Sequence, residues 1–255
     1  MRSNIPQYEL LTPRTLDEAL ALASEGYQPF AGGTDLMVLL ETGKLPLTRF
    51  VSLHNLTDLK GIRARQTHVE IGALVTYTQI RSDPTLRTEF PLLGLAAAET
   101  GSLAIQNRGT LAGNIANASP AADSSPVLLV YDAEINLISA QGVRAIPYSS
   151  FHTGYRTTAL QPGEIIRSIR LPRNKSHWRQ TFRKVGTRKA QAISKVVFAA
   201  AADLGTGEIR VAFGSVAPTP ILSTEIAPID DLRSTARYRR KVAQNLLDEF
   251  MASLR

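Results

Sequence analysis

Apolar residues recur at helical spacing near both ends of the chain. Thr15 and Glu18 form a capping-box pattern, and the apolar positions after them continue to a stop at Gly26. Between Val242 and Leu254 an apolar residue recurs every four positions. The pattern therefore predicts a first and a last helix, and segments of helical composition predict two more, at 36–40 and 90–100.

Short apolar runs with strand character occupy much of the remaining chain. Gln141-Gly142 and Gly205-Thr206-Gly207 each separate two such runs and predict hairpin turns. The predicted strands are 49–53, 68–72, 134–139, 143–146, 164–171, 178–185, 193–204 and 208–216.

The order of these elements changes character near Pro172. Before it, helices and strands are mixed; after it, three strands precede one helix. We therefore expect an α+β chain with a larger domain at 1–172, made of subdomains at about 1–55 and 56–172. A smaller domain at 173–255 is expected to hold an antiparallel sheet and a helix.

Composition narrows the class of protein. The chain has 255 residues, of which 44% are hydrophobic and 20% charged, as in ordinary globular domains. It has no cysteine, which excludes disulfides, thiolate catalysis and an iron–sulfur cluster held by this chain. Its four histidines are scattered, so no metal site is expected. No apolar run is long enough to cross a membrane, and Met1 to Leu11 does not resemble a signal peptide. We expect a cytoplasmic protein.

The net charge of +7 favours acidic ligands or partners. The basic residues are spread along the chain except for one cluster near the C-terminus, Arg237, Arg239, Arg240 and Lys241. The cluster falls on the predicted last helix, so we interpret it as a solvated helix face rather than a nucleic-acid site.

Two loops carry the candidate chemistry. The first, Ala31-Gly32-Gly33-Thr34-Asp35, joins a short run ending at Phe30 to the helix expected from Leu36. Paired glycines let the backbone approach a ligand, successive N–H groups can bind an anion, and a following helix N-terminus favours negative charge. A simple strand-to-helix turn in which Asp35 caps the helix is the alternative.

The second loop is rich in small residues and extends from Thr110 to Asp123. Its polar side chains could line a flat ligand, and the Asp123 carboxylate could accept hydrogen bonds from ribose or ribityl hydroxyls. A helix beginning at Ser119-Pro120 is the alternative, because proline suits the first helical position. Both can hold together. A dinucleotide carries two phosphates, which two such loops would suit.

Other cofactor and catalytic motifs do not occur. Gly205-Thr206-Gly207 lacks the third glycine of a nicotinamide-binding Rossmann fingerprint and lies between two strands. The sequence contains no Walker lysine motif, nucleophile elbow or His-Glu-x-x-His.

The two loops together resemble the FAD-binding motifs of the molybdopterin dehydrogenase flavoprotein family, the medium subunits of xanthine and carbon monoxide dehydrogenases. The likeness covers nearly the whole chain. It continues in Gly154-Tyr155-Arg156, Pro162-Gly163-Glu164-Ile165-Ile166, Phe182-Arg183-Lys184-Val185, Ala190-Gln191-Ala192-Ile193-Ser194-Lys195, Gly214-Ser215-Val216-Ala217-Pro218-Thr219-Pro220 and Asp230-Asp231-Leu232-Arg233-Ser234-Thr235.

The resemblance implies an FAD-binding fold of the vanillyl-alcohol oxidase (PCMH) type and a set of site residues. Asp123 would bind flavin-side hydroxyls, Ile166 and Lys184 would lie against the flavin, and Tyr155 and Arg156 would lie where an electron acceptor docks. The pyrophosphate-side residues implied are Phe30, Ala31, Gly32, Gly33, Thr34, Asp35, Leu36, Thr110, Gly113 and Asn114, with Ala118 beside them.

The resemblance also implies a function. The chain would be the FAD subunit of a molybdenum hydroxylase, an oxidoreductase that passes electrons from a partner's [2Fe–2S] clusters through FAD to NAD, O₂ or a quinone. The FAD would be non-covalent, since neither loop has the His or Cys that attaches flavin in this fold type. An iron–sulfur small subunit and a molybdopterin large subunit would complete a heterotrimer, expected to dimerise. A stand-alone flavin oxidoreductase and a binding module with a decayed flavin site are the alternatives.

Two positions depart from the family pattern. Ala112 stands where the family usually has glycine, and its methyl group is compatible only with a negative φ. The segment near 220–226 is shorter than in the family, which predicts a shortened C-terminal domain.

Overall fold

The computed structural model describes residues 7–189 and 191–255. The start of the segment considered for a signal peptide and Ala190 of the family likeness lie outside the described residues. In the described part, none of the helices combines the length and the apolarity that a membrane crossing requires.

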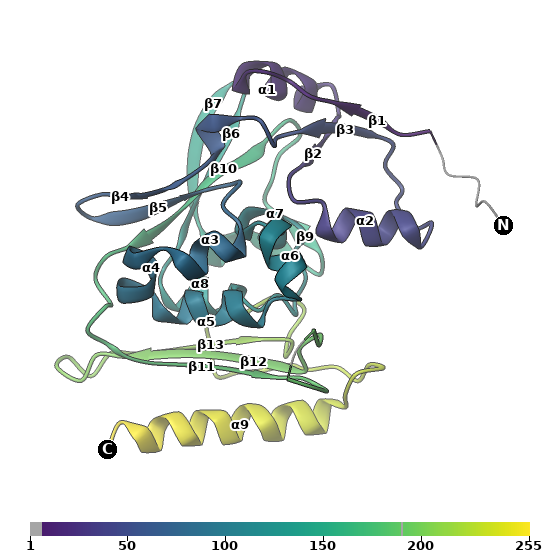
Figure 1. The fold of residues 1–255 in the computed structure, drawn as a ribbon. Coiled ribbons are helices and arrows are strands. Elements are labelled where there is room, and N and C mark those ends of the chain that lie inside the picture. Colours follow the sequence, from purple (N-terminus) through teal and green to yellow (C-terminus); the bar gives the residue numbers. More distant parts are fainter. Residues whose placement is uncertain (1–6, 190) are drawn as a thin grey trace.

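The N-terminal segment forms a small parallel sheet. Its strands β1 (Glu9–Leu11), β2 (Gln28–Phe30) and β3 (Arg49–Ser52) are ordered β1-β3-β2. The connections between them hold α1 (Leu16–Ser24) and α2 (Thr34–Glu41) (Figure 1). The predicted capping box is confirmed, because the Thr15 hydroxyl accepts from the Glu18 N–H and the Glu18 carboxylate accepts from the Thr15 N–H.

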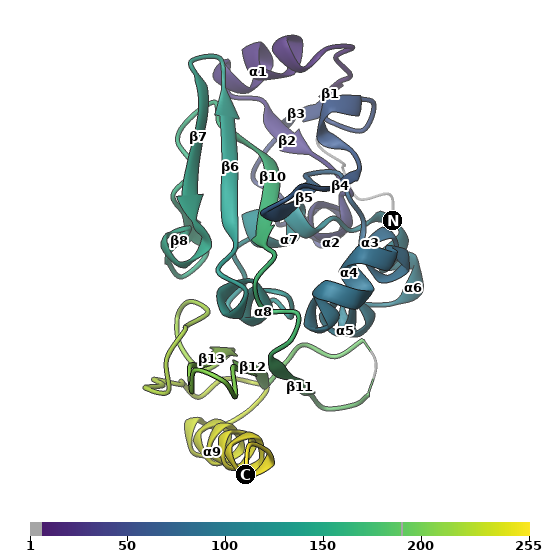
Figure 2. The same cartoon turned by 90° about the vertical axis from the view of Figure 1, so that its left-hand side faces the viewer.

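A five-stranded antiparallel sheet forms the centre of the molecule. Figure 2 shows its long strands side by side. The order is β4 (Ile62–Ala64), β5 (His68–Gly72), β10 (Ile165–Pro172), β6 (Glu134–Ser139) and β7 (Gly142–Pro147). The predicted Gln141-Gly142 hairpin is confirmed, with Ser139 opposite Gly142 and that glycine at a φ of 130°.

Short helices and strands connect and cover this sheet. They are the 3-10 helices η1 (Thr57–Leu59) and η2 (Tyr148–Ser150), the helices α3 (Tyr77–Ser82), α4 (Pro84–Glu89), α5 (Pro91–Glu99), α6 (Leu103–Arg108), α7 (Leu111–Ala116) and α8 (Ser125–Val130), and the strands β8 (His152–Gly154) and β9 (Thr157–Thr158). Of these, α5 matches the helix predicted at 90–100. The other helices were not predicted, because helices of about six residues are too short to show a clear amphipathic repeat.

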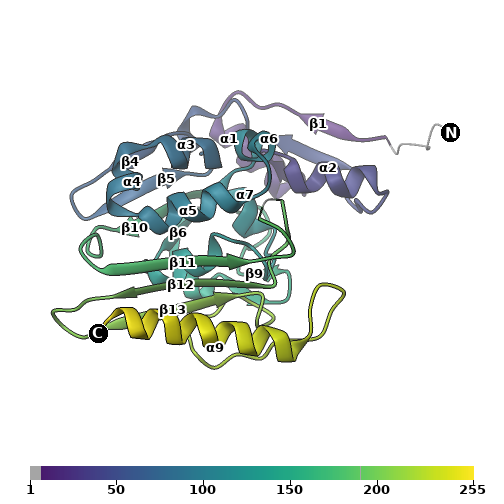
Figure 3. The same ribbon diagram turned by 60° about the horizontal axis from the view of Figure 1, so that its bottom comes forward.

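The C-terminal segment forms an antiparallel sheet of β11 (Arg179–Val185), β12 (Val196–Ala202) and β13 (Ile209–Gly214), with β12 in the middle. Helix α9 (Ala236–Ser253) covers one face, and α5 and α8 cover the other (Figures 1 and 3). All seven residues of β12 are buried. Small side chains such as Ala199 and Ala200 let helices approach both faces of one strand.

The expected solvated face of the last helix needs one correction. Arg237, Arg240 and Lys241 are exposed, but Arg239 is 3% exposed. Its guanidinium donates to the carbonyl oxygens of Lys195 and Ser215 and to the Asp231 carboxylate. The Lys195 and Ser215 carbonyls lie directly before β12 and directly after β13, so Arg239 holds the start of α9 on the sheet.

Candidate functional site

The first glycine loop turns directly from β2 into α2. Gly33 is the N-cap of α2 and has a φ of 73°, a backbone conformation that residues with a Cβ rarely adopt. The alternative in which Asp35 caps the helix is wrong, because Asp35 lies inside the first turn and no side chain caps α2. The Thr34 hydroxyl makes no hydrogen bond within the described part of the chain, so it is available to donate.

Position 32 must be glycine because the backbone directly before the second loop packs against it. A Cβ on Gly32 would lie 2.1 Å from the carbonyl oxygen of Arg108. The Thr34 hydroxyl oxygen lies 3.4 Å from the position that a Cβ on Gly109 would take. The two loops, which are more than seventy positions apart in the sequence, therefore pack against each other (Figure 1).

The second loop is partly helical, which the sequence did not predict. Thr110 is the N-cap of α7, and its hydroxyl accepts from the N–H of Gly113. The helix expected from Ser119-Pro120 is wrong: turns follow α7, and the next helix, α8, begins at Ser125. Ala118 has a φ of 51°, which ends the helical path. Ala112 is helical and buried, so its methyl group is compatible with the backbone, as its negative φ requires.

Asp123 is buried at the end of this loop and already has two partners. One carboxylate oxygen accepts from Lys184 Nζ at 2.7 Å, and the other accepts from Ser194 Oγ at 2.5 Å. Lys184 Nζ also donates to the carbonyl oxygen of Glu99 at 2.7 Å. Burial raises the pKa of Asp123, while Lys184 and Ser194 act against that rise. Ser194 lies in a stretch of the family likeness, but its contact with Asp123 was not predicted, because a serine before a buried strand has many possible partners.

The predicted acceptor-side residues lie in the turn between β8 and β9. Tyr155 is 63% exposed, and Arg156 has a φ of 53°. The Asp35 side chain is accessible to solvent on one side. Partial burial raises the pKa of Asp35, and the positive charge of Arg156 acts against that rise. The turn therefore lies near the first glycine loop. Ile166 is buried on β10, which packs against α7.

His152 ties the same turn to the second loop. Its Nε2 lies 3.0 Å from the carbonyl oxygen of Ile115 in α7. Burial lowers the pKa of His152, so the neutral ring, with its proton on Nε2, fits this contact. The three segments, around residues 30–35, 108–118 and 152–158, thus converge.

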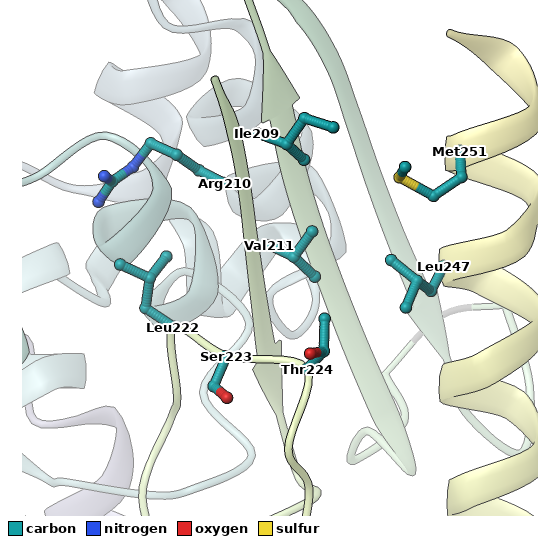
Figure 4. Close-up of a pocket in the computed structure, with 8 residues that line it drawn as sticks. All are labelled: Ile209, Arg210, Val211, Leu222, Ser223, Thr224, Leu247 and Met251. Atoms are coloured by element: carbon teal, nitrogen blue, oxygen red, sulfur yellow. The ribbon is translucent and has the colours of Figure 1, made fainter. Parts of the chain in front are cut away.

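A groove lies away from the two loops, in the C-terminal segment. It is an open groove of about 520 Å³ between β13 and α9, and its walls include Val211, Leu222 and Leu247 (Figure 4). The groove is mostly apolar and borders the segment after Pro220 that the sequence marks as short. None of the predicted site residues lines it. In the described residues, no three His, Cys, Asp or Glu side chains are grouped to hold a metal ion.

Comparison with known proteins identifies relatives along most of the chain. A family model described as the FAD binding domain in molybdopterin dehydrogenase matches residues 6–174. The xanthine dehydrogenase FAD-binding subunit of Escherichia coli O157:H7 is 36% identical over 214 residues, which cover 81% of this chain and 73% of that subunit. The carbon monoxide dehydrogenase medium chain of Afipia carboxidovorans is 26% identical over 265 residues, covering 92% of each chain.

A solved structure shares the fold. Reconstituted CO dehydrogenase from Oligotropha carboxidovorans contains a chain that matches with a TM-score of 0.89 at 24% sequence identity, covering 96% of both chains. The predicted α+β fold is confirmed by this match and by the mixture of helices and small sheets.

Proposed function

The chain belongs to the family of FAD-binding domains in molybdopterin dehydrogenases, and from that membership we propose that it carries one dissociable FAD in a molybdenum hydroxylase. Its relatives are oxidoreductases by name. When bound, FAD would supply electron-transfer chemistry between a partner's [2Fe–2S] clusters and an acceptor such as NAD, O₂ or a quinone. The proposed partners are an iron–sulfur small subunit and a molybdopterin large subunit, in a heterotrimer that dimerises.

The packing of the two glycine loops is the observation that carries this proposal. It brings the Thr34 hydroxyl and the first N–H groups of α2 beside Arg108 and Gly109, directly before the second loop. A diphosphate needs several donors converging from more than one side. We assign the diphosphate to these donors, with Phe30 to Leu36 on one side and Thr110, Gly113 and Asn114 on the other.

The flavin end of the cofactor is assigned to the buried side of the site. Asp123 can accept from ribityl hydroxyls with the lone pairs that Lys184 and Ser194 leave free. We place Ile166 and Lys184 against the flavin and Tyr155 and Arg156 at the acceptor side. The domain boundary is proposed at residue 172, where β10 ends before the C-terminal sheet begins.

Reconstitution with FAD tests the proposal directly. The purified full chain, mixed with FAD and passed through a desalting column, is expected to retain about one FAD per chain and to show both flavin absorption bands. Acid precipitation should release all of the yellow colour, since the attachment is non-covalent. A chain that stays colourless at saturating FAD contradicts the proposal.

The electron route needs a second measurement. The FAD-loaded chain should be reduced by a pre-reduced [2Fe–2S] subunit of its complex and should resist reduction by organic substrates alone. Reduction of the isolated chain by an organic substrate would instead indicate a stand-alone oxidoreductase.

A further inference from the structure

One buried hydroxyl beside the two loops has no hydrogen-bond partner. Tyr77 is 2% exposed, and within the described residues its hydroxyl oxygen is buried without a hydrogen bond. Buried polar groups are nearly always paired, so an exception of this kind calls for an explanation. The neighbouring core tyrosine Tyr131 shows the usual arrangement: its hydroxyl donates to Gln180 and accepts from the N–H of Leu92.

The position of Tyr77 is fixed by the second loop. Its N–H donates to the carbonyl oxygen of Gly109 at 3.1 Å, and the preceding Thr76 forms a β-bridge with Thr110. Its ring lies 3.6 Å from where a Cβ on Gly109 would stand. The ring is therefore directly beneath the point where the two loops meet.

The hydroxyl of Tyr77 faces a short polar path that ends at the loop surface. Ser124, which is fully buried, is its polar neighbour and donates its own hydroxyl proton to Asn114 Oδ1 at 3.0 Å. Asn114 is partly exposed, and its Nδ2 has no partner in the described part of the chain. With Oδ1 engaged from below, the amide is held with Nδ2 available as a donor.

Tyr77 determines which hydroxyl donates and which accepts along this path. A serine hydroxyl can either donate or accept, so Ser124 alone does not fix which end of the Asn114 amide it contacts. Tyr77 stays protonated, since burial raises its pKa far above the ordinary value, with the carboxylates of Asp123 and Asp35 adding to the rise. A tyrosine that donates to Ser124 Oγ leaves the serine proton for Asn114 Oδ1.

We propose that Tyr77, Ser124 and Asn114 form a one-way hydrogen-bond relay that holds the Asn114 amide group ready to donate to a bound dinucleotide. Tyr77 and Ser124 are positioning residues, and Asn114 is the residue that touches the ligand. The Tyr77 hydroxyl is buried with Ser124 as its polar neighbour, and the relay requires Tyr77 to donate to Ser124 Oγ. The relay rests on the proposed function, because it presumes that Asn114 contacts FAD.

Tyr77→Phe gives the sharpest test. The variant removes a hydroxyl that has no partner in the ligand-free chain, so its ligand-free Tm should be unchanged or raised by about 2–4 °C. The Kd for FAD should rise roughly 3- to 30-fold, because the amide of Asn114 loses its fixed direction. FAD affinity is read from flavin fluorescence on titration, and Tm is measured with and without saturating FAD.

Tyr131→Phe is the matched control and should show the opposite signature. Its hydroxyl is partnered within the protein, so the variant should lower the ligand-free Tm and leave the Kd for FAD unchanged. Equal shifts of Tm in the presence and absence of FAD for Tyr77→Phe, with an unchanged Kd, would assign that hydroxyl a merely structural role and overturn the relay.

A double-mutant cycle separates positioning from direct contact. Ser124→Ala and Asn114→Ala should each weaken FAD binding, and together they should be no worse than Asn114→Ala alone, since Ser124 acts through Asn114. Additive losses would overturn the relay. If the wild-type chain binds no FAD, the proposed function fails and the relay with it. If the wild type binds FAD and Tyr77→Phe binds it equally well, the relay alone fails.

Discussion

The glycine at position 32 shows how one missing side chain can serve two loops. The sequence favoured glycines there so that a ligand could approach the backbone. In the structure the space beside Gly32 is filled by the Arg108 carbonyl group, and the space beside Gly33 by the ring of Phe30. The glycines are required by the protein's own packing, and any ligand would bind on the opposite side of the loop.

We expect Gly32→Ala to separate the loops. The added Cβ would lie 2.1 Å from a backbone oxygen, so one loop must move. FAD retention should fall at least tenfold, and the free energy of unfolding should fall by about 1–3 kcal/mol, as in other overpacked sites. Equilibrium FAD titration and urea unfolding measure the two effects.

Gly94 provides the control for that substitution. It lies inside α5, and nothing stands within 4 Å of a Cβ placed on it. Gly94→Ala should therefore raise the free energy of unfolding by about 0.5–1 kcal/mol, since alanine is the better helix former. FAD binding should be unchanged. A loss of FAD from both variants would show that the effect of Gly32→Ala is not specific to the loops.

At the scale of elements, long or strongly patterned segments were predictable and short ones were not. The sequence correctly placed α1, the β6–β7 hairpin and the C-terminal strand order, because capping, turn and alternation signals agree there. It missed α7, whose Gly113 and Asn114 are poor helix formers. That helix is stabilised by the Thr110 cap and by burial of Leu111 and Ile115, and burial is a property of the fold.

Residues of the candidate site followed the same division. Glycines and small polar residues marked both loops in the sequence, but nothing indicated that the loops touch. Tyr77 escaped notice, since a tyrosine beginning a short helix is ordinary in sequence. Ser194 belongs to a stretch of the family likeness, but nothing in the sequence indicated its contact with Asp123. Their importance arises from neighbours 32 or more positions away along the chain.

Arg239 anchors helix α9 to the sheet, although it lies in a cluster of basic residues whose sequence pattern predicts a solvated face. Arg239→Ala would leave the carbonyl oxygens of Lys195 and Ser215 without this donor and Asp231 with Arg233 as its remaining cationic partner. We expect a loss of roughly 3–5 kcal/mol in the free energy of unfolding. Arg240→Ala, one residue further along and exposed, should change it by less than about 0.5 kcal/mol. Comparable losses in chemical denaturation of the two variants would contradict the assigned anchoring role.

At the scale of the whole molecule, the C-terminal sheet is fastened to the rest at two buried or half-buried ionic contacts. Asp132, after α8, pairs with Lys175 and Arg210. Asp123, in the second loop, pairs with Lys184 on β11. All three pairs join residues more than forty positions apart in the sequence. The Asp123–Lys184 pair connects β11 of the C-terminal sheet directly to the candidate site.

Lys184→Met should lower the free energy of unfolding, because it leaves the buried Asp123 carboxylate without its cation. Removing one partner of a buried pair typically costs about 3–5 kcal/mol, and the pKa of Asp123, already raised by burial, should rise further. A group whose pKa is higher in the folded chain becomes less costly as the pH falls, because the folded state takes up the proton first. The deficit, measured by urea unfolding, should therefore be smaller at pH 5 than at pH 8.

Adding Asp123→Asn to Lys184→Met should recover part of the lost stability and remove the pH dependence of the deficit. A deficit that is the same at both pH values in the single variant would show that lost packing of the lysine chain, and not the uncompensated carboxylate, is responsible.

The Asp123 contacts set a limit on dissection of this protein. A fragment ending at residue 172 would contain both glycine loops, yet it would lack Lys184 and Ser194 and so leave the Asp123 carboxylate with neither of its partners. The same cut would expose the faces of α5 and α8 that pack against the C-terminal sheet. A fragment that keeps both partners of Asp123 must therefore include the segment from Lys184 on β11 to Ser194 before β12.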